Sequence, residues 1–179
     1  MDKNKFLEKY LYNKETHVGK LLKYQVDEVL LPSGEKAVRE VVKHPGAVAI
    51  VAILSDGKII FVKQYRYAID NIIYEIPAGK LSPGENPIDC AKRELKEETG
   101  YSAAKWTKLS SIFTVPGFCD EVIHIYKAEQ LTAGEQQLDE DELIETFSFT
   151  QAQIQDMVNS QCICDAKTLA GLFLCELNK

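Results

Sequence analysis

Three glutamates, Glu94, Glu97 and Glu98, lie close together in the run Arg93–Gly100 and have the types and spacing to do chemistry. On a helix their side chains fall within one arc of about 100°. Like charges at this spacing repel each other by a few tenths of a kcal/mol per pair, and the helix dipole disfavours anions near the C-terminus. Clustered carboxylates are oxygen ligands of the kind that Mg²⁺ uses beside substrate phosphates. The run therefore has two interpretations: a divalent cation site, or a solvated charged face with lysines interleaved.

The helix that must present these glutamates has recognisable ends. Asn86 can cap it, Pro87 suits its first position, and Gly100 can end it in a left-handed conformation. An apolar stripe at helical spacing gives the helix a face for packing, formed by Ile88, Ala91 and Leu95. The sequence therefore predicts an amphipathic helix over residues 87–99.

Other elements follow from turns and apolar runs. Polar turns at 32–35 and 55–57 predict two hairpins, the first joining strands 24–31 and 36–42 and the second joining 47–54 and 58–62. Further strands are predicted at 73–77, 106–114 and 122–126, and helices at 152–159 and 165–177. Strands that enclose a central helix, with helices around them, indicate a mixed α/β sandwich.

The composition limits the class of protein. The chain has 179 residues, 45% of them hydrophobic and 27% charged, which is typical of one globular domain. A net charge of −6 gives no electrostatic basis for binding nucleic acid or anionic membranes. The sequence shows neither an apolar run long enough to span a bilayer nor a signal peptide. The odd number of cysteines, 5, indicates reduced thiols, so we expect a cytoplasmic protein.

Other catalytic patterns are missing from the sequence. His17, His44 and His124 lack metal-ligand spacing, and there is no nucleophile elbow, P-loop, dinucleotide fingerprint or zinc-protease motif. Any phosphates would be held by a metal and arginine side chains rather than by a glycine-rich loop.

The wider sequence decides between the two interpretations of the carboxylates. Gly79, five residues, Glu85, seven residues and then Arg93–Tyr101 match the Nudix box, Gx5Ex7REUxEExGU, at every fixed position. Seven fixed letters at ordinary residue frequencies give a chance match on the order of 10⁻⁹. Residues 39–40, 64–66, 74–79 and 111–121 also resemble the ADP-ribose pyrophosphatase branch of this family, which characteristically has a proline where Pro116 stands. The resemblance covers roughly residues 15–178.

The resemblance implies a set of metal-site residues. Nudix hydrolases cleave a nucleoside diphosphate linked to another moiety, using Mg²⁺ or Mn²⁺ and an activated water. Glu94 and Glu98 would be the core metal ligands, with Glu97 assisting and the Ala78 carbonyl as a further ligand. Glu97 and Glu98 also belong to the implied catalytic set.

Four further positions of the box would be structural. Arg93 would orient Glu97, whereas Gly79 and Gly100 would serve as backbone positions. For Glu85 a metal role and a loop-holding role both remain open.

The acidic run 139–142 is a solvated loop by composition. In the branch that the chain resembles, a glutamate from this loop moves over the pyrophosphate. Glu140 and Glu142 both align with that glutamate, so either could be the general base. We expect Glu140 as the base and Glu142 as a metal ligand, with catalysis depending on loop closure.

Substrate recognition would need cations and an aromatic platform. By resemblance, Arg66 would face the phosphates, Arg39 and Glu40 would reach the adenine, often in the partner subunit, and Glu121 would lie near the phosphates beside Pro116. A surface role for Glu121 is equally open. The stacking aromatic is open among Phe6, Tyr12 and Tyr24, and Trp106 is expected in the core.

Together these residues predict an α/β/α Nudix sandwich with a mixed sheet, at residues 45–179, and an N-terminal antiparallel β extension at 1–44. The resemblance implies Mg²⁺-dependent hydrolysis of ADP-ribose to AMP and ribose 5-phosphate by a homodimer joined through the extension. The alternatives are another nucleoside diphosphate sugar or a dinucleotide as substrate, or a sensor that binds ADP-ribose without cleaving it. The intact carboxylates of the box argue against the sensor.

Overall fold

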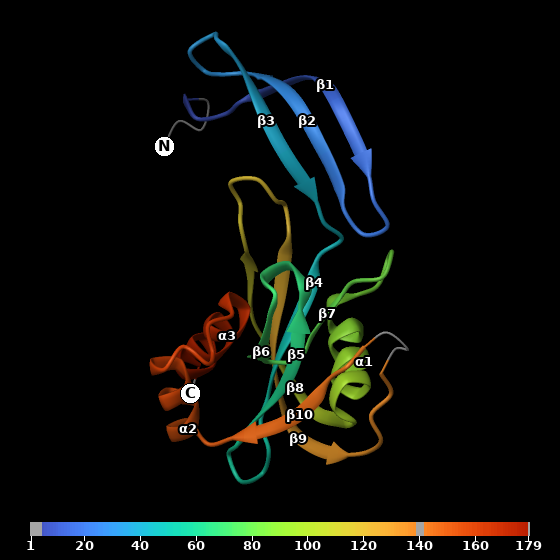
Figure 1. Ribbon diagram of the computed structural model, residues 1–179, viewed down its shortest axis with the longest axis vertical. Helices are drawn as coiled ribbons and strands as arrows, with labels where there is room; N and C mark the ends of the chain where they lie inside the picture. Colours follow the sequence, from blue (N-terminus) through green and yellow to red (C-terminus); the bar gives the residue numbers. More distant parts are fainter. Residues whose placement is uncertain (1–4, 139–141, 179) are drawn as a thin grey trace. The chain divides into compact units, whose positions relative to one another are not determined.

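The computed structural model describes residues 5–138 and 142–178, and the chain divides into two compact units (Figure 1). One unit comprises residues 1–45 and 113–122, and the other comprises 46–112 and 123–179. None of the helices in the described ranges combines the length and the apolar character that a membrane crossing requires.

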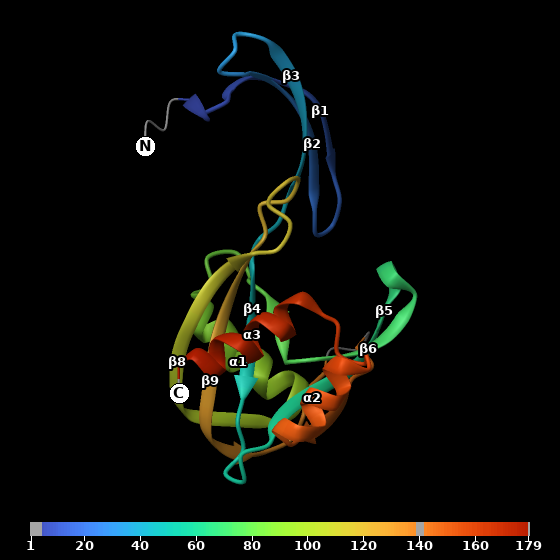
Figure 2. The same ribbon diagram turned by 90° about the vertical axis from the view of Figure 1, so that its left-hand side faces the viewer.

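The first unit is built on an antiparallel sheet in the order β1-β2-β3, formed by β1 (Lys9–Val18), β2 (Lys23–Leu30) and β3 (Lys36–Lys43). Figure 2 shows these three strands curving together. The predicted β2–β3 hairpin is confirmed, and Gly34 in its turn has a φ of 90° that favours glycine. Strand β1 was not predicted, because most of its side chains are exposed and it lacks an apolar alternation.

Two sheets form the second unit. The four-stranded sheet has the order β7-β4-β9-β8, and the three-stranded sheet has the order β10-β5-β6. Strand β4 pairs parallel to β9 and antiparallel to β7, which makes the sheet mixed, as predicted. The strands are β4 (Ala47–Ala52), β5 (Ile59–Arg66), β6 (Asn71–Glu75), β7 (Ala78–Lys80), β8 (Tyr101–Phe113), β9 (Val122–Ala133) and β10 (Glu145–Phe149), with a 3₁₀ turn, η2 (Tyr67–Ile69), between β5 and β6.

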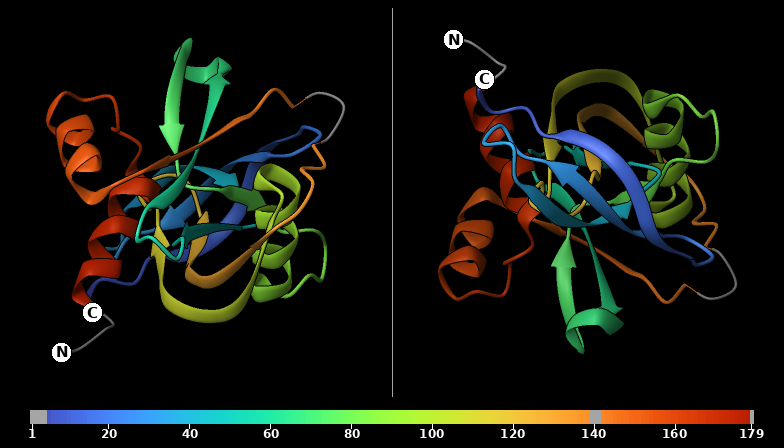
Figure 3. Two further views of the ribbon diagram at one scale, coloured as in Figure 1. Left: turned by 90° about the horizontal axis from the view of Figure 1, so that it is seen from below. Right: turned by 90° about the horizontal axis from the view of Figure 1, so that it is seen from above.

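Strand β4 is the centre of the core, because every one of its six residues is buried. Its alternate side chains face two different helical layers. Ala47, Ala49 and Val51 belong to a cluster with residues of α2 (Gln151–Asn159) and α3 (Ala166–Leu177). The intervening side chains pack against α1 (Pro87–Thr99). Figure 3 shows α1 on one side of the strands and the other two helices on the opposite side, as expected for an α/β/α sandwich.

The second predicted hairpin is wrong, although its turn exists. Strands β4 and β5 belong to different sheets and share only an isolated bridge between Ile53 and Ile59. Both edges of β4 are already occupied by β7 and β9, so β5 pairs with β6 and β10 instead. The structure also contains β10, which was not predicted, and β8 and β9 are longer than expected.

Candidate active site

Helix α1 positions the carboxylates, and its ends are those that the sequence predicts. Pro87 is the first helical residue, and Gly100 follows the helix with a φ of 75°. Asn86 occupies the N-cap position, but its side chain makes no capping hydrogen bond. The apolar stripe packs against β4, with Ala91 and Leu95 buried. Packing of this face fixes the rotation of the helix and therefore the direction of its glutamates.

Glu98 is the most buried of these glutamates, with 3% of the residue exposed. One of its carboxylate oxygens accepts a hydrogen bond from the backbone N–H of Ala78, at 2.9 Å. Burial raises the pKa of Glu98 to about 8; the negative charges of Glu94 and Glu142 also raise it, whereas Arg66 lowers it. Helix α1, the start of β7 and the end of β5 therefore meet around this carboxylate.

Glu94 lies directly against the backbone of Gly79. A Cβ atom built on Gly79 would stand 1.8 Å from the carboxyl carbon of Glu94, so only glycine leaves room for this side chain. Burial is the main cause that raises the pKa of Glu94, with neighbouring Glu97 and Glu142 contributing, although Arg93 opposes the change. The requirement for glycine in the box thus has a steric cause.

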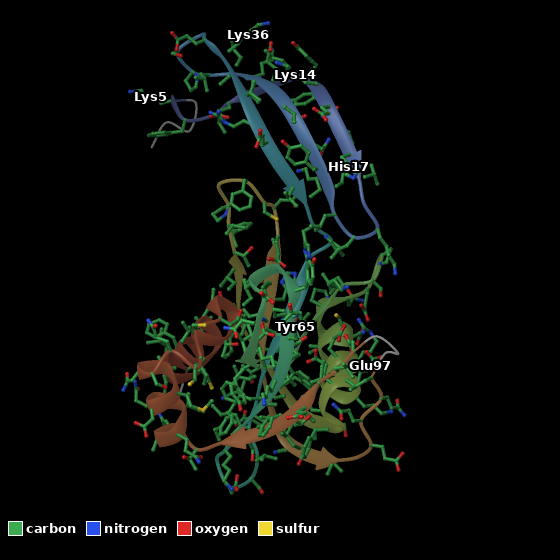
Figure 4. All side chains as sticks on the ribbon, viewed as in Figure 1. Lys5, Lys14, His17, Lys36, Tyr65 and Glu97 are labelled. Carbon is green, nitrogen blue, oxygen red and sulfur yellow. The ribbon has the colours of Figure 1, made fainter. Side chains whose placement is uncertain are left out.

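Arg93 donates hydrogen bonds to three carboxylates of the box, those of Glu85, Glu94 and Glu97. Its guanidinium donates to both oxygens of Glu85 at 3.0 Å, to Glu94 at 2.7 Å and to Glu97 at 2.9 Å. Glu85 also accepts from the backbone N–H of Ser82 at 2.9 Å, and the arginine lowers the pKa of Glu85 to about 2. Both oxygens of Glu85 are thereby engaged in holding the loop, which favours the loop-holding interpretation. Glu97 projects from the same helix (Figure 4).

The donor set fits a divalent cation. Glu94 and Glu98 are carboxylates with little exposure to solvent, and burial raises the pKa of both, so a bound cation would offset the cost of their negative charges. Carboxylate and carbonyl oxygens are the ligands that Mg²⁺ prefers. Within residues 5–138 and 142–178, no three acidic, histidine or cysteine side chains already surround one point as metal ligands do. Glu142 is described and exposed, whereas Glu140 lies outside the described residues.

The C-terminal end of α1 is fastened by uncharged donors. The backbone N–H of Gln137 donates to the carbonyl of Glu97 at 3.0 Å, and the side chains of Gln136 and Thr146 donate to the carbonyl of Glu98. A Cβ atom on Gly100 would stand 2.7 Å from the carbonyl oxygen of Gly134, so glycine is needed there for space as well as for its φ.

Arg66 is paired with an acidic residue to which we assigned no role from the sequence. Its Nε and Nη2 atoms lie 2.8 and 2.7 Å from one oxygen of Glu75, which is buried in β6. The other oxygen of Glu75 accepts from Lys167 of α3, and Lys167 also lies 3.0 Å from Asp165. A charged residue inside the predicted strand 73–77 was the available signal, because such a residue needs a partner when buried.

A second group of predicted residues lies in the first unit. Arg39, Glu40 and Pro116 line one cavity of about 420 Å³, together with Glu8 and residues of the segment 117–120. The guanidinium of Arg39 is bound by both oxygens of Glu8, at 2.9 and 2.5 Å. Glu8 could not be predicted from the sequence, since a lone acid near the N-terminus is ordinarily a solvated residue.

Glu121 and the candidate aromatic residues have other surroundings. Glu121 accepts a hydrogen bond from the hydroxyl of Thr114 at 2.8 Å and lies 3.5 Å from His44, so it closes its own loop. The Tyr12 hydroxyl donates to Glu28 on the neighbouring strand, and Phe6 is exposed. Trp106 packs edge-on against Tyr126 in the core, which confirms the prediction for it. Tyr24 is half-buried, and burial raises its pKa, with the negative charge of Glu40 contributing.

Comparison with known proteins agrees with this geometry. The NUDIX domain model matches residues 43–162. ADP-ribose pyrophosphatase of Bacillus subtilis is 44% identical over 174 residues, covering 96% of this chain and 94% of that protein. The methanol dehydrogenase activator of Bacillus methanolicus is 42% identical over 176 residues, covering 97% and 95%.

A solved structure described as an ADP compounds hydrolase superposes with a TM-score of 0.83, covering 94% of this chain and 92% of that one. Its sequence identity is 24%, so it shows the fold. With a complete box over residues 79–101, a family model matched over most of the chain and relatives that align over nearly their whole length, the chain belongs to the Nudix family.

Proposed function

We propose that the protein hydrolyses the pyrophosphate bond of ADP-ribose to AMP and ribose 5-phosphate in the presence of Mg²⁺, with Mn²⁺ as a second usable ion. The observation that carries the proposal is the pair of buried carboxylates, Glu94 and Glu98, held against Ala78 and Gly79 in a complete Nudix box. The substrate is supported by the relatives named ADP-ribose pyrophosphatase, one from Bacillus subtilis and another from Mycobacterium tuberculosis, both 44% identical to this chain where they align.

Glu94, Glu98 and the Ala78 carbonyl would hold the inner metal ion, and Glu97 and Glu142 would hold or assist an outer one. When bound, such ions polarise the phosphoryl oxygens, offset the substrate's negative charge and lower the pKa of water. Arg93 keeps Glu97 and Glu94 in place through its hydrogen bonds. Glu98 must lose its proton before it can act as a ligand, and its N–H partner at Ala78 stabilises that ionised form.

Glu140 would take the proton from the attacking water as general base. It lies outside the described residues, so this role stays a prediction from the resemblance. Glu142 is the described member of the same run, and its charge acts on both Glu94 and Glu98. The variants Glu140→Gln and Glu142→Gln distinguish the two roles, because loss of the base lowers kcat at saturating Mg²⁺ whereas loss of a ligand is offset by more Mg²⁺. A kcat within tenfold of wild type for both variants would refute the loop proposal.

Each unit has its own candidate residues for recognising the nucleotide. In the second unit, Arg66 would offer its charge to the phosphates. In the first unit, the cavity lined by Arg39, Glu40 and Pro116 has a cation, an acceptor and apolar surface, and by the resemblance Arg39 and Glu40 would reach the adenine, often in the partner subunit. Arg39 would have to exchange part of its pairing with Glu8 for such a contact. We keep Glu121 as a candidate substrate residue, to be tested by Glu121→Gln.

We also propose a homodimer joined through the N-terminal extension of residues 1–44, with residues 45–179 as the hydrolase domain. Of the described residues in β1 to β3, Val29 alone is fully buried, and several large apolar side chains are exposed: Tyr10, Tyr12, Val18 and Val38. A three-stranded sheet without a covered apolar face is not expected to be stable alone. Five free cysteines support a reducing location such as the cytoplasm.

The test is product analysis with a panel of ADP-ribose, ADP-glucose, GDP-mannose, FAD and NADH. Release of AMP fastest from ADP-ribose supports the proposal, whereas preference for another compound keeps the chemistry and replaces the substrate. The alternative is worth testing because a relative with nearly the same identity is named as a dehydrogenase activator. Glu98→Gln should lower kcat by orders of magnitude, and the exposed Glu145→Gln is its matched control. Cleavage of no compound by the folded protein would favour a sensor.

A further inference from the structure

We infer that Lys167 is a positioning residue for substrate binding, which acts on the pyrophosphate through Glu75 and Arg66. The inference rests on the proposed function, in which Arg66 contacts the phosphates. It assigns a role in substrate recognition to α3, a helix that lies outside the Nudix box.

The three side chains form a continuous chain of ion pairs. Glu75 is 2% exposed. One of its carboxylate oxygens accepts a hydrogen bond from Arg66, and the other accepts one from Lys167. The side chain of Lys167 is 12% exposed, so its ammonium group has little competing water. A buried carboxylate shared in this way restricts the positions of both cations. If either cation moved away, one oxygen of the buried carboxylate would lose its partner.

One edge of the Arg66 guanidinium contacts Glu75, and the other edge is available to a ligand. Its Nε and Nη2 atoms both lie near a single oxygen of Glu75, and the described part of the chain provides no hydrogen-bond partner for Nη1. Since a guanidinium has five N–H donors, three remain for a ligand. The side chain is 40% exposed, and two parallel donors at a fixed angle suit the oxygens of a phosphate.

The backbone around Glu75 is fastened from the same helix. The hydroxyl of Thr168 accepts a hydrogen bond from the N–H of Ile76 at 3.0 Å and donates to Asp165 at 2.6 Å. Gly171 lets α3 approach the sheet, because a Cβ atom there would stand 2.8 Å from the Ile76 side chain. Ala78, which meets Glu98, follows three residues after Glu75. The start of α3 therefore has a fixed position relative to the carboxylates.

Removing Lys167 changes both charge and geometry. Arg66, Glu75, Lys167 and Asp165 together carry no net charge, so the group would become negative next to an anionic substrate. Glu75 would also be free to engage Arg66 with both oxygens, which turns the guanidinium away from its present orientation. The expected consequence is weaker binding of the pyrophosphate rather than slower chemistry.

The test is a double-mutant cycle of Lys167→Met and Arg66→Met. We would measure kcat and KM for ADP-ribose with Mg²⁺, and the Kd for ADP-ribose by calorimetry in EDTA, where no turnover competes. Each single variant should raise Kd and KM about tenfold, and Lys167→Met should change kcat less than threefold. Adding Lys167→Met to Arg66→Met should raise Kd no further, because Lys167 acts through Arg66. Lys167→Arg, which keeps the cation, should restore binding to within threefold of wild type.

Two controls separate this role from a structural one. Lys105→Met removes an exposed lysine from β8 and should leave Kd unchanged. Thermal unfolding of every variant detects damage to α3. Such damage would make Lys167→Met lower Tm by the same amount in the wild-type protein and in the Arg66→Met variant. If Lys167→Met does not fold, Lys167→Gln takes its place in the cycle, because it keeps a donor for Glu75 without the charge.

The outcomes distinguish the inference from the proposed function. Wild-type binding of ADP-ribose with an unchanged Kd for Lys167→Met refutes the inference alone. Additive effects in the double variant also refute it, since Lys167 would then act independently of Arg66. A wild-type protein that neither binds nor cleaves ADP-ribose refutes the proposed function, and the inference with it.

Discussion

Replacing Glu98 by glutamine should stabilise the metal-free protein at alkaline pH, even though it removes a proposed metal ligand. The reason lies in the burial of this carboxylate, which raises its pKa to about 8 from an ordinary value of 4.5. Between these two pH values the folded state keeps a proton that the unfolded chain releases. The free energy of unfolding of the wild-type protein must therefore fall as the pH rises across this interval.

The size of the effect follows from the same interval. From 4.5 to about 8, the loss of stability amounts to about 5 kcal/mol as an upper value. Roughly 1.4 kcal/mol of this is already lost at about pH 5.5, and about 4.6 kcal/mol is lost at about pH 8.5. Glutamine does not ionise, and its carbonyl oxygen can still accept from Ala78. The stability advantage of Glu98→Gln over wild type should thus grow by about 3 kcal/mol between the two pH values.

Urea unfolding in EDTA at these two pH values, with wild type, Glu98→Gln and Glu145→Gln, measures the difference. Glu145→Gln should follow wild type, because Glu145 is an exposed residue of β10. Added Mg²⁺ should stabilise the wild-type protein far more than Glu98→Gln, since ligand binding to the folded state raises its stability. An advantage of Glu98→Gln that stays the same at both pH values would refute the argument from burial.

Three further substitutions test the frame around the carboxylates. Gly79→Ala should lower kcat at least a hundredfold but cost only about 1–2 kcal/mol in urea unfolding, because the new methyl group displaces the movable end of Glu94; activity near wild type would contradict this. Gly100→Ala should cost about 3 kcal/mol or more, since it adds a left-handed alanine and a backbone clash at 2.7 Å, and an unchanged Tm would contradict it. Arg93→Met should lower the free energy of unfolding by roughly 2 kcal/mol, which is less than for a fully buried ion pair because the Arg93 side chain is 35% exposed. A loss below about 0.5 kcal/mol would show that the carboxylates do not depend on Arg93.

The parts of the fold that could be predicted from the sequence are those with local signals. Helix α1 has Pro87 at its start and Gly100 after its end, and the β2–β3 hairpin has a polar turn with Gly34. The β4–β5 hairpin failed because strand pairing is decided by which edges remain free in the assembled sheet, and a turn does not carry that information. Strand β1 has almost no buried face, so it leaves no periodic pattern.

The candidate site divides in the same way. Glu94, Glu97 and Glu98 follow from their spacing, because helix α1 holds all three. The partners of Arg66 do not, since Lys167 comes from a helix about 100 residues further along the chain. The partner of Arg39 was likewise missed, because Glu8 reaches it from outside the sheet register. Long-range ion pairs depend on tertiary packing rather than on local sequence.

The end of α1 has a consequence for how cations approach the protein. Within residues 5–138 and 142–178, the donors to the carbonyls of Lys96, Glu97 and Glu98 are uncharged amide and hydroxyl groups, from Gly100, Gln136, Gln137 and Thr146. These carbonyls therefore have hydrogen-bond partners, but these partners bring no positive charge to neutralise the negative electrostatic potential of the helix C-terminus. That potential adds to the field of the glutamates and should draw divalent ions from solution. Association of the ion should then slow as ionic strength rises, even though the groups that finally bind it are shielded from salt.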